Sequence, residues 1–215
     1  MNKKILAMLA VLVVGTAPAV SMADTSANVG WISDYLFRGV YQAGSSASGG
    51  IDWSGKGGAY LGTWAANVKQ GLEVDLYGGY GGGKGDFSWK GGYTGYYYTD
   101  VFDNYYQEIN GNLSYGILSV DLAVGHYMVP GDTQTYTFGA ITLSPKNAPY
   151  FKIGGFGQDS SGSYFEMGHG FTVAGLDMSI AMVYSKDLQV TPNAGDGRFA
   201  LTVGFTKTID LGGKK

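Results

Sequence analysis

Alternation between apolar and polar residues is the feature that most constrains how this chain can fold. In the segment "LSVDLAV" at 118–124, Ser119, Asp121 and Ala123 separate the larger apolar residues. Because successive side chains of a β-strand point to opposite faces, a period of two predicts a strand with one apolar and one polar face. The same period recurs at 72–80, 107–115, 176–184 and 198–206.

Weaker alternation fills the gaps between these segments. It predicts strands at 27–38, 47–53, 59–66, 86–97, 134–143, 149–156 and 163–173, which brings the total to twelve. Each is near the ~9–11 residues that a tilted membrane-spanning strand needs. The sequence therefore predicts an all-β fold, a single antiparallel transmembrane β-barrel of about twelve strands, within a range of roughly ten to fourteen.

The predicted connections are of two kinds, which alternate along the chain. One set is tight and mostly Gly-rich, at 54–58, 81–85, Gly116, 144–149 and 174–175. The other set is mostly longer and more polar, at 39–47, 98–104, 129–134, 157–163 and 185–197, with the short segment 67–71 as an exception. Outer-membrane barrels have short periplasmic turns and longer extracellular loops, so the alternation favours this class.

Composition narrows the class of protein further. The chain has 37 Gly, 17 Tyr and no Cys, and its net charge of −3 does not indicate a nucleic-acid partner. Without Cys, disulfides cannot stabilise it as they stabilise small extracellular modules. After the N-terminal segment, no apolar run is long enough for a membrane helix, so a membrane protein with this sequence must be a β-barrel.

The first 23 residues have the three parts of a Sec-type signal peptide. Lys3 and Lys4 form the basic end, 5–14 is the apolar run, and Ser21 and Ala23 are the small residues before the cleavage site. We expect residues 1–23 to be removed and 24–215 to form the barrel. The expected location is the outer membrane of a Gram-negative bacterium, with membrane lipid and the barrel-assembly machinery as partners.

Aromatic residues share the apolar face near the ends of the predicted strands. A soluble sandwich or barrel would show the same alternation, but it has no need for this placement. The pattern is typical of the aromatic girdle of a membrane barrel. The predicted lipid-interface aromatics are Trp31, Tyr35, Phe37, Trp53, Tyr80, Tyr115, Tyr184 and Phe205.

Charged residues lie on the opposite, inward face. In "ISDYLFRGVYQ" at 32–42, Asp34 and Arg38 share one face of the predicted strand, while Tyr35 and Phe37 share the other. The pair could close a salt bridge or take part in ion selection. The predicted pore-lining residues are Asp34, Arg38, Glu73, Asp75, Glu108, Asp121, Glu166, Asp177 and Arg198, and Asp52, Lys90 and Lys152 share their face. Acids outnumber bases, which predicts a lumen that prefers cations.

Three segments, "SDYLFRGVYQ", "GIDWSGKGGAYLGTWAANV" and "LEVDLYGGY", together with "SYFEMGHGFTVAGLDMSIAMVY", resemble the TorF family of proposed porins. The resemblance covers most of the chain after the signal peptide and implies a small outer-membrane β-barrel that acts as a porin. The matching residues are Ser33, Asp34, Tyr35, Phe37, Arg38, Gly39, Gln42, Gly62, Trp64, Asn67, Glu73 and Asp75. The chain departs from the family at Tyr41, where a small polar residue is expected, and at its non-aromatic C-terminus.

No catalytic or metal site is predicted, and no cofactor. A lipid hydrolase of this membrane needs a Ser, a His and an acid, but neither His126 nor His169 has a Ser two positions on, where a strand would place it on the same face. Two His 43 residues apart without Cys give no metal-ligand spacing. We therefore expect a passive diffusion channel for small ions or polar solutes. The alternative is a closed structural or adhesive barrel whose own side chains fill its lumen.

Overall fold

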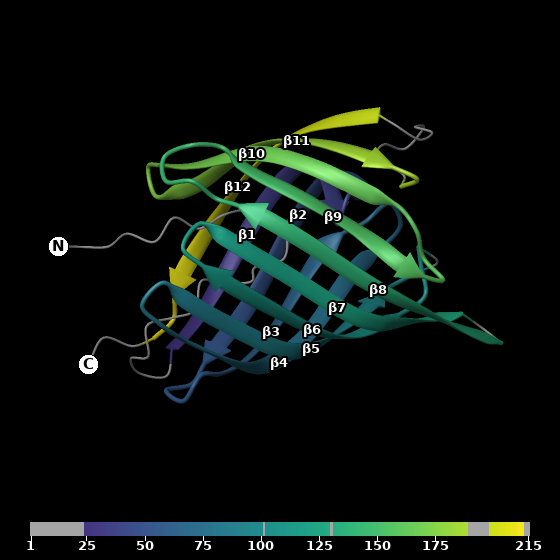
Figure 1. Cartoon of the computed structure of the whole chain (residues 1–215), viewed down its shortest axis with the longest axis horizontal. Helices are drawn as coiled ribbons and strands as arrows, with labels where there is room; N and C mark the ends of the chain where they lie inside the picture. The colour runs from purple at the N-terminus through teal and green to yellow at the C-terminus, as the bar shows by residue number, and fades with distance from the viewer. Residues whose placement is uncertain (1–23, 101, 130, 189–197, 213–215) are drawn as a thin grey trace.

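In the computed structural model the protein is a closed antiparallel barrel of twelve strands. Figure 1 shows how the strands are arranged around it. The structure describes residues 24–212 except 101, 130 and 189–197, so the predicted signal peptide lies outside the described residues. The strands are β1 (Asp24–Phe37), β2 (Val40–Ser54), β3 (Ala59–Asn67), β4 (Leu72–Lys84), β5 (Phe87–Tyr98), β6 (Tyr106–Tyr115), β7 (Leu118–Val129), β8 (Asp132–Leu143), β9 (Tyr150–Gln158), β10 (Ser163–Val173), β11 (Leu176–Lys186) and β12 (Arg198–Asp210). Each strand pairs with its neighbours in sequence, and β1 pairs with β12 to close the barrel. The predicted fold class is confirmed.

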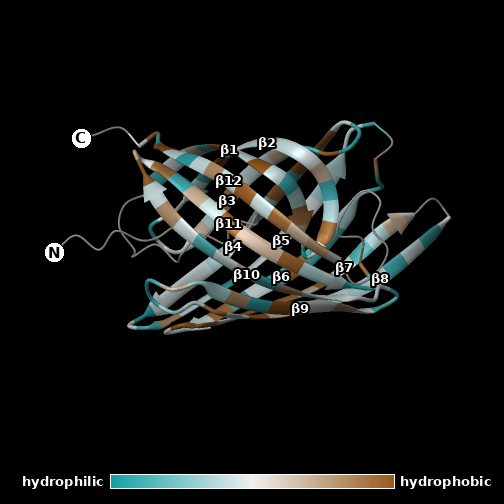
Figure 2. Ribbon diagram, turned by 90° about the horizontal axis from the view of Figure 1, so that it is seen from above, coloured by the Kyte–Doolittle hydropathy of each residue, from teal (hydrophilic) through white to brown (hydrophobic). Residues whose placement is uncertain are grey.

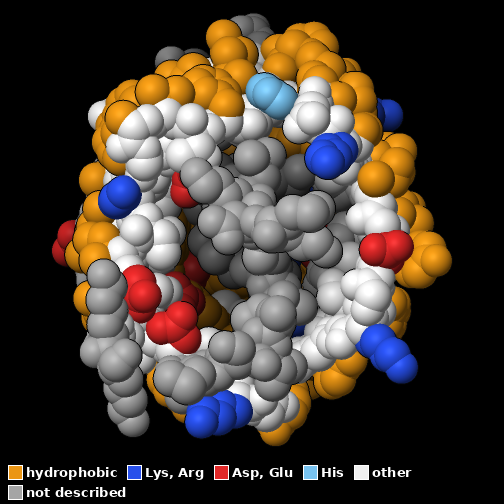
Figure 3. All heavy atoms as spheres, turned by 90° about the vertical axis from the view of Figure 1, so that its left-hand side faces the viewer, with side chains coloured by type: hydrophobic (Ala, Val, Ile, Leu, Met, Phe, Trp, Pro, Cys, Tyr) orange, Lys and Arg blue, Asp and Glu red, His pale blue; other side chains and the backbone are white. Residues whose placement is uncertain are grey.

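The apolar face of each strand points away from the barrel axis. On β7, Leu122 and Val124 are 57% and 55% exposed, whereas Ala123 between them is buried. Hydrophobic and hydrophilic positions alternate along the ribbons in Figure 2, and from one end the hydrophobic side chains form the outer perimeter (Figure 3). A soluble barrel would bury its apolar face instead, and an apolar outer surface of this extent is typical of contact with lipid. No helix within the described part of the chain is long and apolar enough to cross a membrane.

The two ends of the barrel differ in their connections. The turn end carries the connections 55–58, 85–86, 116–117, 144–149 and 174–175, together with the start of β1 and the end of β12. The loop end carries 38–39, 68–71, 99–105, 130–131, 159–162 and 187–197. Three predicted connections are wrong in extent, because 39–47, 81–85 and 129–134 are largely strand. The Gly, Ser and Thr residues of these segments are typical of loops, but in the structure the segments continue the paired strands of extended hairpins.

The β1–β2 hairpin leaves the barrel wall before it reaches the loop end. β1 pairs with β12 only as far as Ile32, and β2 pairs with β3 only from Ser48 onward. Between them, residues 33–45 form ladder pairs only with each other among the described strands; we call this segment the inner hairpin. Its turn is Arg38-Gly39, and both residues have positive φ, 51° and 81°. Two central residues with positive φ are what a two-residue hairpin turn with the twist of its strands requires.

The outward placement of Leu122 predicts a large cost for a charge at that position. Leu122→Arg should lower the free energy of unfolding in lipid vesicles by about 2–4 kcal/mol, because the guanidinium would enter the hydrocarbon near mid-strand. Leu211, which follows β12 at the turn end, is the matched control, and Leu211→Arg should cost only about 0–1 kcal/mol. Denaturant titration of the refolded barrel measures both. Equal losses would contradict the assignment of the outer face to lipid.

Candidate functional site in the barrel lumen

An ion pair at the tip of the inner hairpin joins it to the opposite wall of the barrel. Arg38 Nη1 donates to Glu108 Oε2 at 2.7 Å, and Nη2 donates to Oε1 at 2.8 Å. Glu108 lies on β6, and its side chain is fully buried. Two parallel charge-assisted hydrogen bonds fix the orientation of both groups as well as their distance. Asp34 was predicted as the partner that Arg38 could pair with, but the structure pairs Arg38 with Glu108 instead.

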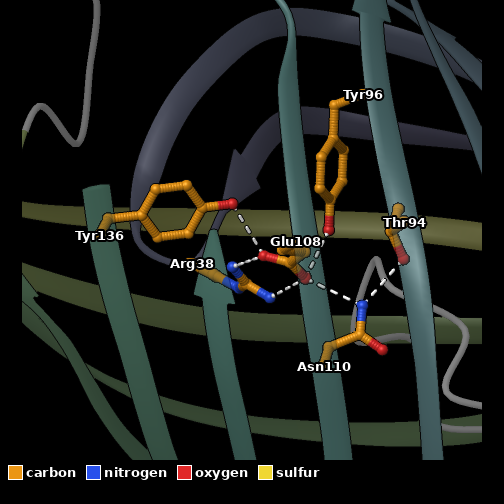
Figure 4. Close-up of polar contacts among 6 residues, drawn as sticks. All are labelled: Arg38, Thr94, Tyr96, Glu108, Asn110 and Tyr136. Atoms are coloured by element: carbon orange, nitrogen blue, oxygen red, sulfur yellow. Dashed lines mark hydrogen bonds and ion pairs between the residues drawn. The ribbon is translucent and has the colours of Figure 1, made fainter. Parts of the chain in front are cut away.

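Glu108 accepts three further hydrogen bonds in the same cluster (Figure 4). Tyr96 Oη donates to it at 3.0 Å, Tyr136 Oη at 2.9 Å, and Asn110 Nδ2 at 3.1 Å. These donors come from β5, β8 and β6, so the carboxylate is saturated by groups from three strands of the wall. A buried carboxylate is tolerated when its charge is paired and its lone pairs are used in this way.

Aromatic rings enclose the guanidinium of Arg38. Its central carbon lies 4.1 Å from the centroid of the Phe138 ring and 4.8 Å from that of Phe37. Phe37 in turn packs on Tyr96, with ring centroids 5.4 Å apart. Cation–π contacts of this kind are strongest where water is excluded. Phe37 was predicted at the lipid interface, and this is wrong because the hairpin turns its ring into the lumen.

The turn of the inner hairpin is also held by β10 and β11. Ser185 Oγ donates a hydrogen bond of 2.8 Å to the carbonyl oxygen of Gly39, and Ser185 is fully buried. A Cβ at Gly39 would lie 2.7 Å from Cβ of Tyr164. The close approach and the positive φ together restrict this position to Gly. The hairpin therefore spans the lumen from the β1–β2 wall to β6, β8, β10 and β11.

An apolar cluster fills the lumen around the hairpin. It consists of Ala123, Phe138, Ala140, Tyr164, Val183 and Ala200, and Leu36 of the inner hairpin packs against it. The wall residues come from β7, β8, β10, β11 and β12. At this level the interior is packed like a protein core.

Tyr35 holds the other side of the inner hairpin. It is 1% exposed, its hydroxyl donates to Glu73 Oε1 at 2.9 Å, and its ring makes an edge contact with Trp64. Its predicted place at the lipid interface is therefore wrong, because the hairpin carries it inside. Glu73 and Asp75 lie on the inward face of β4 at 1% and 4% exposure, and one oxygen of each has no hydrogen-bond partner within the described part of the chain.

The remaining predicted pore-lining residues lie at several levels of the barrel, from the loop end to the turn end. Asp121 lies 4.0 Å from Lys152 and accepts from Asn112 at 2.7 Å. Glu166 accepts a hydrogen bond from Tyr150, and Asp177 accepts one from Thr172 at 2.8 Å. Asp34 is half-buried on the inner hairpin. Arg198 begins β12, and its side chain lies outside the described residues.

The other predicted interface aromatics lie on strand positions of the outer face. Trp53, Tyr80 and Tyr115 are 42%, 53% and 68% exposed. Ring contacts join Trp31 to Phe205 and Tyr184 to Phe199. Tyr136, Phe138 and Ser185, which hold the hairpin tip, were not among the predicted site residues. The alternation of apolar and polar residues places these three side chains on the inward face. Nothing local in the sequence, however, marks them as partners of a hairpin from elsewhere in the chain.

At the loop end, the inner hairpin lines one side of a hollow of about 560 Å³. Its lining includes Tyr41 and Gln42 of the hairpin, Lys69 and Gln70 of the β3–β4 loop, and Asp103. Polar, charged and aromatic side chains all contribute to its lining.

The ion pair predicts a large loss of stability when Arg38 alone is removed. Arg38→Ala should lower the free energy of unfolding by about 3–5 kcal/mol, because Glu108 would remain buried without a compensating charge. Lys152→Ala is the matched control: its ion pair with Asp121 is longer and partly exposed, so the loss should stay below about 1 kcal/mol. Denaturant titration compares the two. A loss for Arg38→Ala no larger than the control would show that the hairpin tip is not held as described.

The barrel is similar to solved outer-membrane porins. A KdgM porin matches with a TM-score of 0.58 at 11% identity, over 85% of this chain and 98% of that one. A KdgM porin in complex with disordered oligogalacturonate matches with a TM-score of 0.56 at 10% identity, over 85% and 98% of the two chains. The COG4313 outer membrane channel from Pseudomonas putida F1 has a TM-score of 0.47 at 10% identity, over 91% and 98%. At these identities the likeness to the two KdgM structures supports the fold alone.

No curated protein matches the sequence. A family model described as a bacterial protein of unknown function (Gcw_chp) matches residues 16–212, which is nearly the whole chain. The chain therefore belongs to the Gcw_chp family of bacterial proteins.

Proposed function

We propose that the protein is an outer-membrane porin through which small ions or polar solutes diffuse, and that the inner hairpin controls passage through its lumen. The observation that carries the proposal is a closed barrel with an apolar outer face and charged side chains on its inner face. Charges on the inward face need a polar or wet interior, which a channel provides. The motif resemblance to the TorF family supports the same function. No catalytic step is assigned.

The proposal includes the route by which the protein reaches the membrane. Residues 1–23 act as a cleaved signal peptide, and the barrel of residues 24–215 is inserted by the barrel-assembly machinery. The support is the three-part pattern of the N-terminal segment and the apolar band on the strands. The turn end would then face the periplasm and the loop end the exterior.

A preference for cations follows from the balance of inward charges. Glu73 and Asp75 lie inward on β4, and Asp52 on β2 bonds to the Tyr77 hydroxyl from β4, whereas Arg38 is neutralised by Glu108. An excess of fixed negative charge raises the local concentration of cations. The oligogalacturonate of the KdgM complex is a polyanion, so this lumen is poorly suited to that class of solute.

The second candidate function is a closed structural barrel. The specific observation that favours it is the apolar cluster around Leu36, which together with the hairpin fills the lumen at one level. In that case the hairpin would be a permanent part of the core. The two candidates differ in whether the lumen conducts once the hairpin is removed.

Removing the inner hairpin should therefore increase conductance. Residues 33–45 would be replaced by Asn-Gly, which joins the paired residues Ile32 and Ser46 through a type I′ turn. Single-channel recording in a planar bilayer should show larger and more frequent steps for this variant than for the full-length barrel. The matched control trims the β7–β8 hairpin, which projects beyond the barrel in Figure 1, by replacing 128–133 with Asn-Gly between Tyr127 and Gln134. A folded variant without the inner hairpin that conducts nothing would establish the closed barrel instead.

Ion selectivity should depend on the acids of β4. In the variant lacking 33–45, Glu73→Gln with Asp75→Asn should shift the reversal potential in a salt gradient toward zero, because two fixed negative charges leave the lumen. Asp86→Asn in the exposed β4–β5 turn is the control and should leave the reversal potential almost unchanged. Anion selectivity before any acid is removed would contradict the proposed cation preference.

A further inference from the structure

Two buried carboxyl groups on β4 lack the partners that buried charges normally have. Glu73 is 1% exposed and Asp75 is 4% exposed. Glu73 Oε1 accepts from Tyr35, but Glu73 Oε2 and Asp75 Oδ1 are buried without a hydrogen-bond partner in the described part of the chain. An unpaired buried carboxylate costs several kcal/mol, on the order of the whole stability of a small domain. Something must compensate these groups.

Arg38, the cation at the tip of the inner hairpin, is already paired. The guanidinium of Arg38 makes two hydrogen bonds to Glu108 and is enclosed by Phe37 and Phe138. Asp103 and Glu108 act on the same pair as further negative charges. Both acids therefore make the local field at β4 more negative.

The two side chains lie on one face of β4, close enough for their charges to act on each other, with tyrosines opposite them on β5. Because Glu73 and Asp75 are two positions apart on a strand, they share its inward face. Tyr98 lies opposite Glu73, and Tyr96 lies opposite Asp75, on the neighbouring strand β5. Trp64 lies opposite Asp75 on β3, and the edge of its ring meets Tyr35. Carboxylate oxygens with nearby hydroxyl groups are the ligands that hard cations prefer.

We propose that Glu73 and Asp75 form a binding site for a hard divalent cation of the Ca²⁺ type in the barrel lumen, beneath the inner hairpin. Two carboxylates supply two negative charges, which a divalent ion balances and a monovalent ion does not. Ca²⁺ sites are irregular in geometry, with Ca–O distances of roughly 2.3–2.6 Å, and water completes the coordination. The inward residues of β4 become less buried toward the turn end, from Asp75 to Tyr77, which gives the ion a path from that side.

The site would also connect the cation to the hairpin. Tyr35 donates to Glu73, so an ion on the free oxygen of Glu73 would orient the carboxylate that holds this part of the hairpin. The proposal does not rest on conduction, because a closed barrel with the same lumen would bind the ion equally well. Protonation of the two carboxyl groups is the competing way to remove their charge.

Terbium luminescence tests the site in the refolded, full-length barrel in detergent. Tb³⁺ replaces Ca²⁺ at oxygen sites, and Trp64, Tyr35, Tyr96 and Tyr98 would transfer excitation energy to it. We expect saturable sensitised emission that Ca²⁺ displaces. Glu73→Gln with Asp75→Asn should weaken Tb³⁺ binding by at least about tenfold, because the number of charged ligands sets cation affinity. Glu166→Gln, an inward acid already bonded to Tyr150, should leave binding unchanged.

Two results would overturn the proposal. The first is emission from the unsubstituted barrel no stronger than that of the Glu73→Gln, Asp75→Asn variant, with both proteins folded by circular dichroism. The second is an infrared band of protonated carboxyl groups that disappears in the same variant and persists at saturating Ca²⁺, because a proton would then compensate the charges instead of a metal ion. Calorimetric titration with Ca²⁺ alone provides an independent measure of the same affinity.

Discussion

Every backbone N–H and C=O that meets lipid must be paired within the protein, and the arrangement of this barrel follows from that constraint. Closure of β1 on β12 removes the two free edges that an open sheet would have. Where the β1–β2 hairpin leaves the wall the strand ladder is interrupted, and side chains take over there. Ser33 Oγ accepts from the Val203 amide at 3.0 Å, and Asn67 Oδ1 accepts from the Ala47 amide at 2.6 Å. The wall can therefore release a hairpin into the lumen.

The wall of the barrel was predictable from the sequence because lipid and lumen impose opposite polarity on alternate residues. Leu122 and Ala123 differ in exposure as their alternation requires, and Glu73, Asp75 and Glu108 point inward as predicted. Most turns at the turn end were predicted at the right place for the same reason. The loop end was predicted less well, since there hairpins extend beyond the region where polarity alternates.

The inner hairpin could not be predicted because an aromatic side chain is suited both to the lipid interface and to a packed lumen. Tyr35 and Phe37 have the parity of outward residues, and a strand that stayed in the wall would have placed them in lipid. The partner of Arg38 lies 70 residues away on β6, so no local pattern connects them. The departure from the wall depends on contacts of the hairpin with β3, β6, β8, β10 and β11, which a local sequence pattern does not encode.

The chemistry of the hairpin tip favours a hairpin that can leave its position in the lumen. A lumen built only to be filled could use apolar side chains throughout, as Ala140, Val183 and Ala200 do. A buried ion pair adds little net stability, because the attraction between its charges mainly offsets their desolvation. It does specify one geometry, through two parallel hydrogen bonds between Arg38 and Glu108. If the hairpin moves away and water enters, both charges are solvated again and much of that desolvation cost is recovered. The pair therefore specifies a single position for the hairpin but adds little free energy of stabilisation to that position. This agrees better with a controlled pore than with a permanent core.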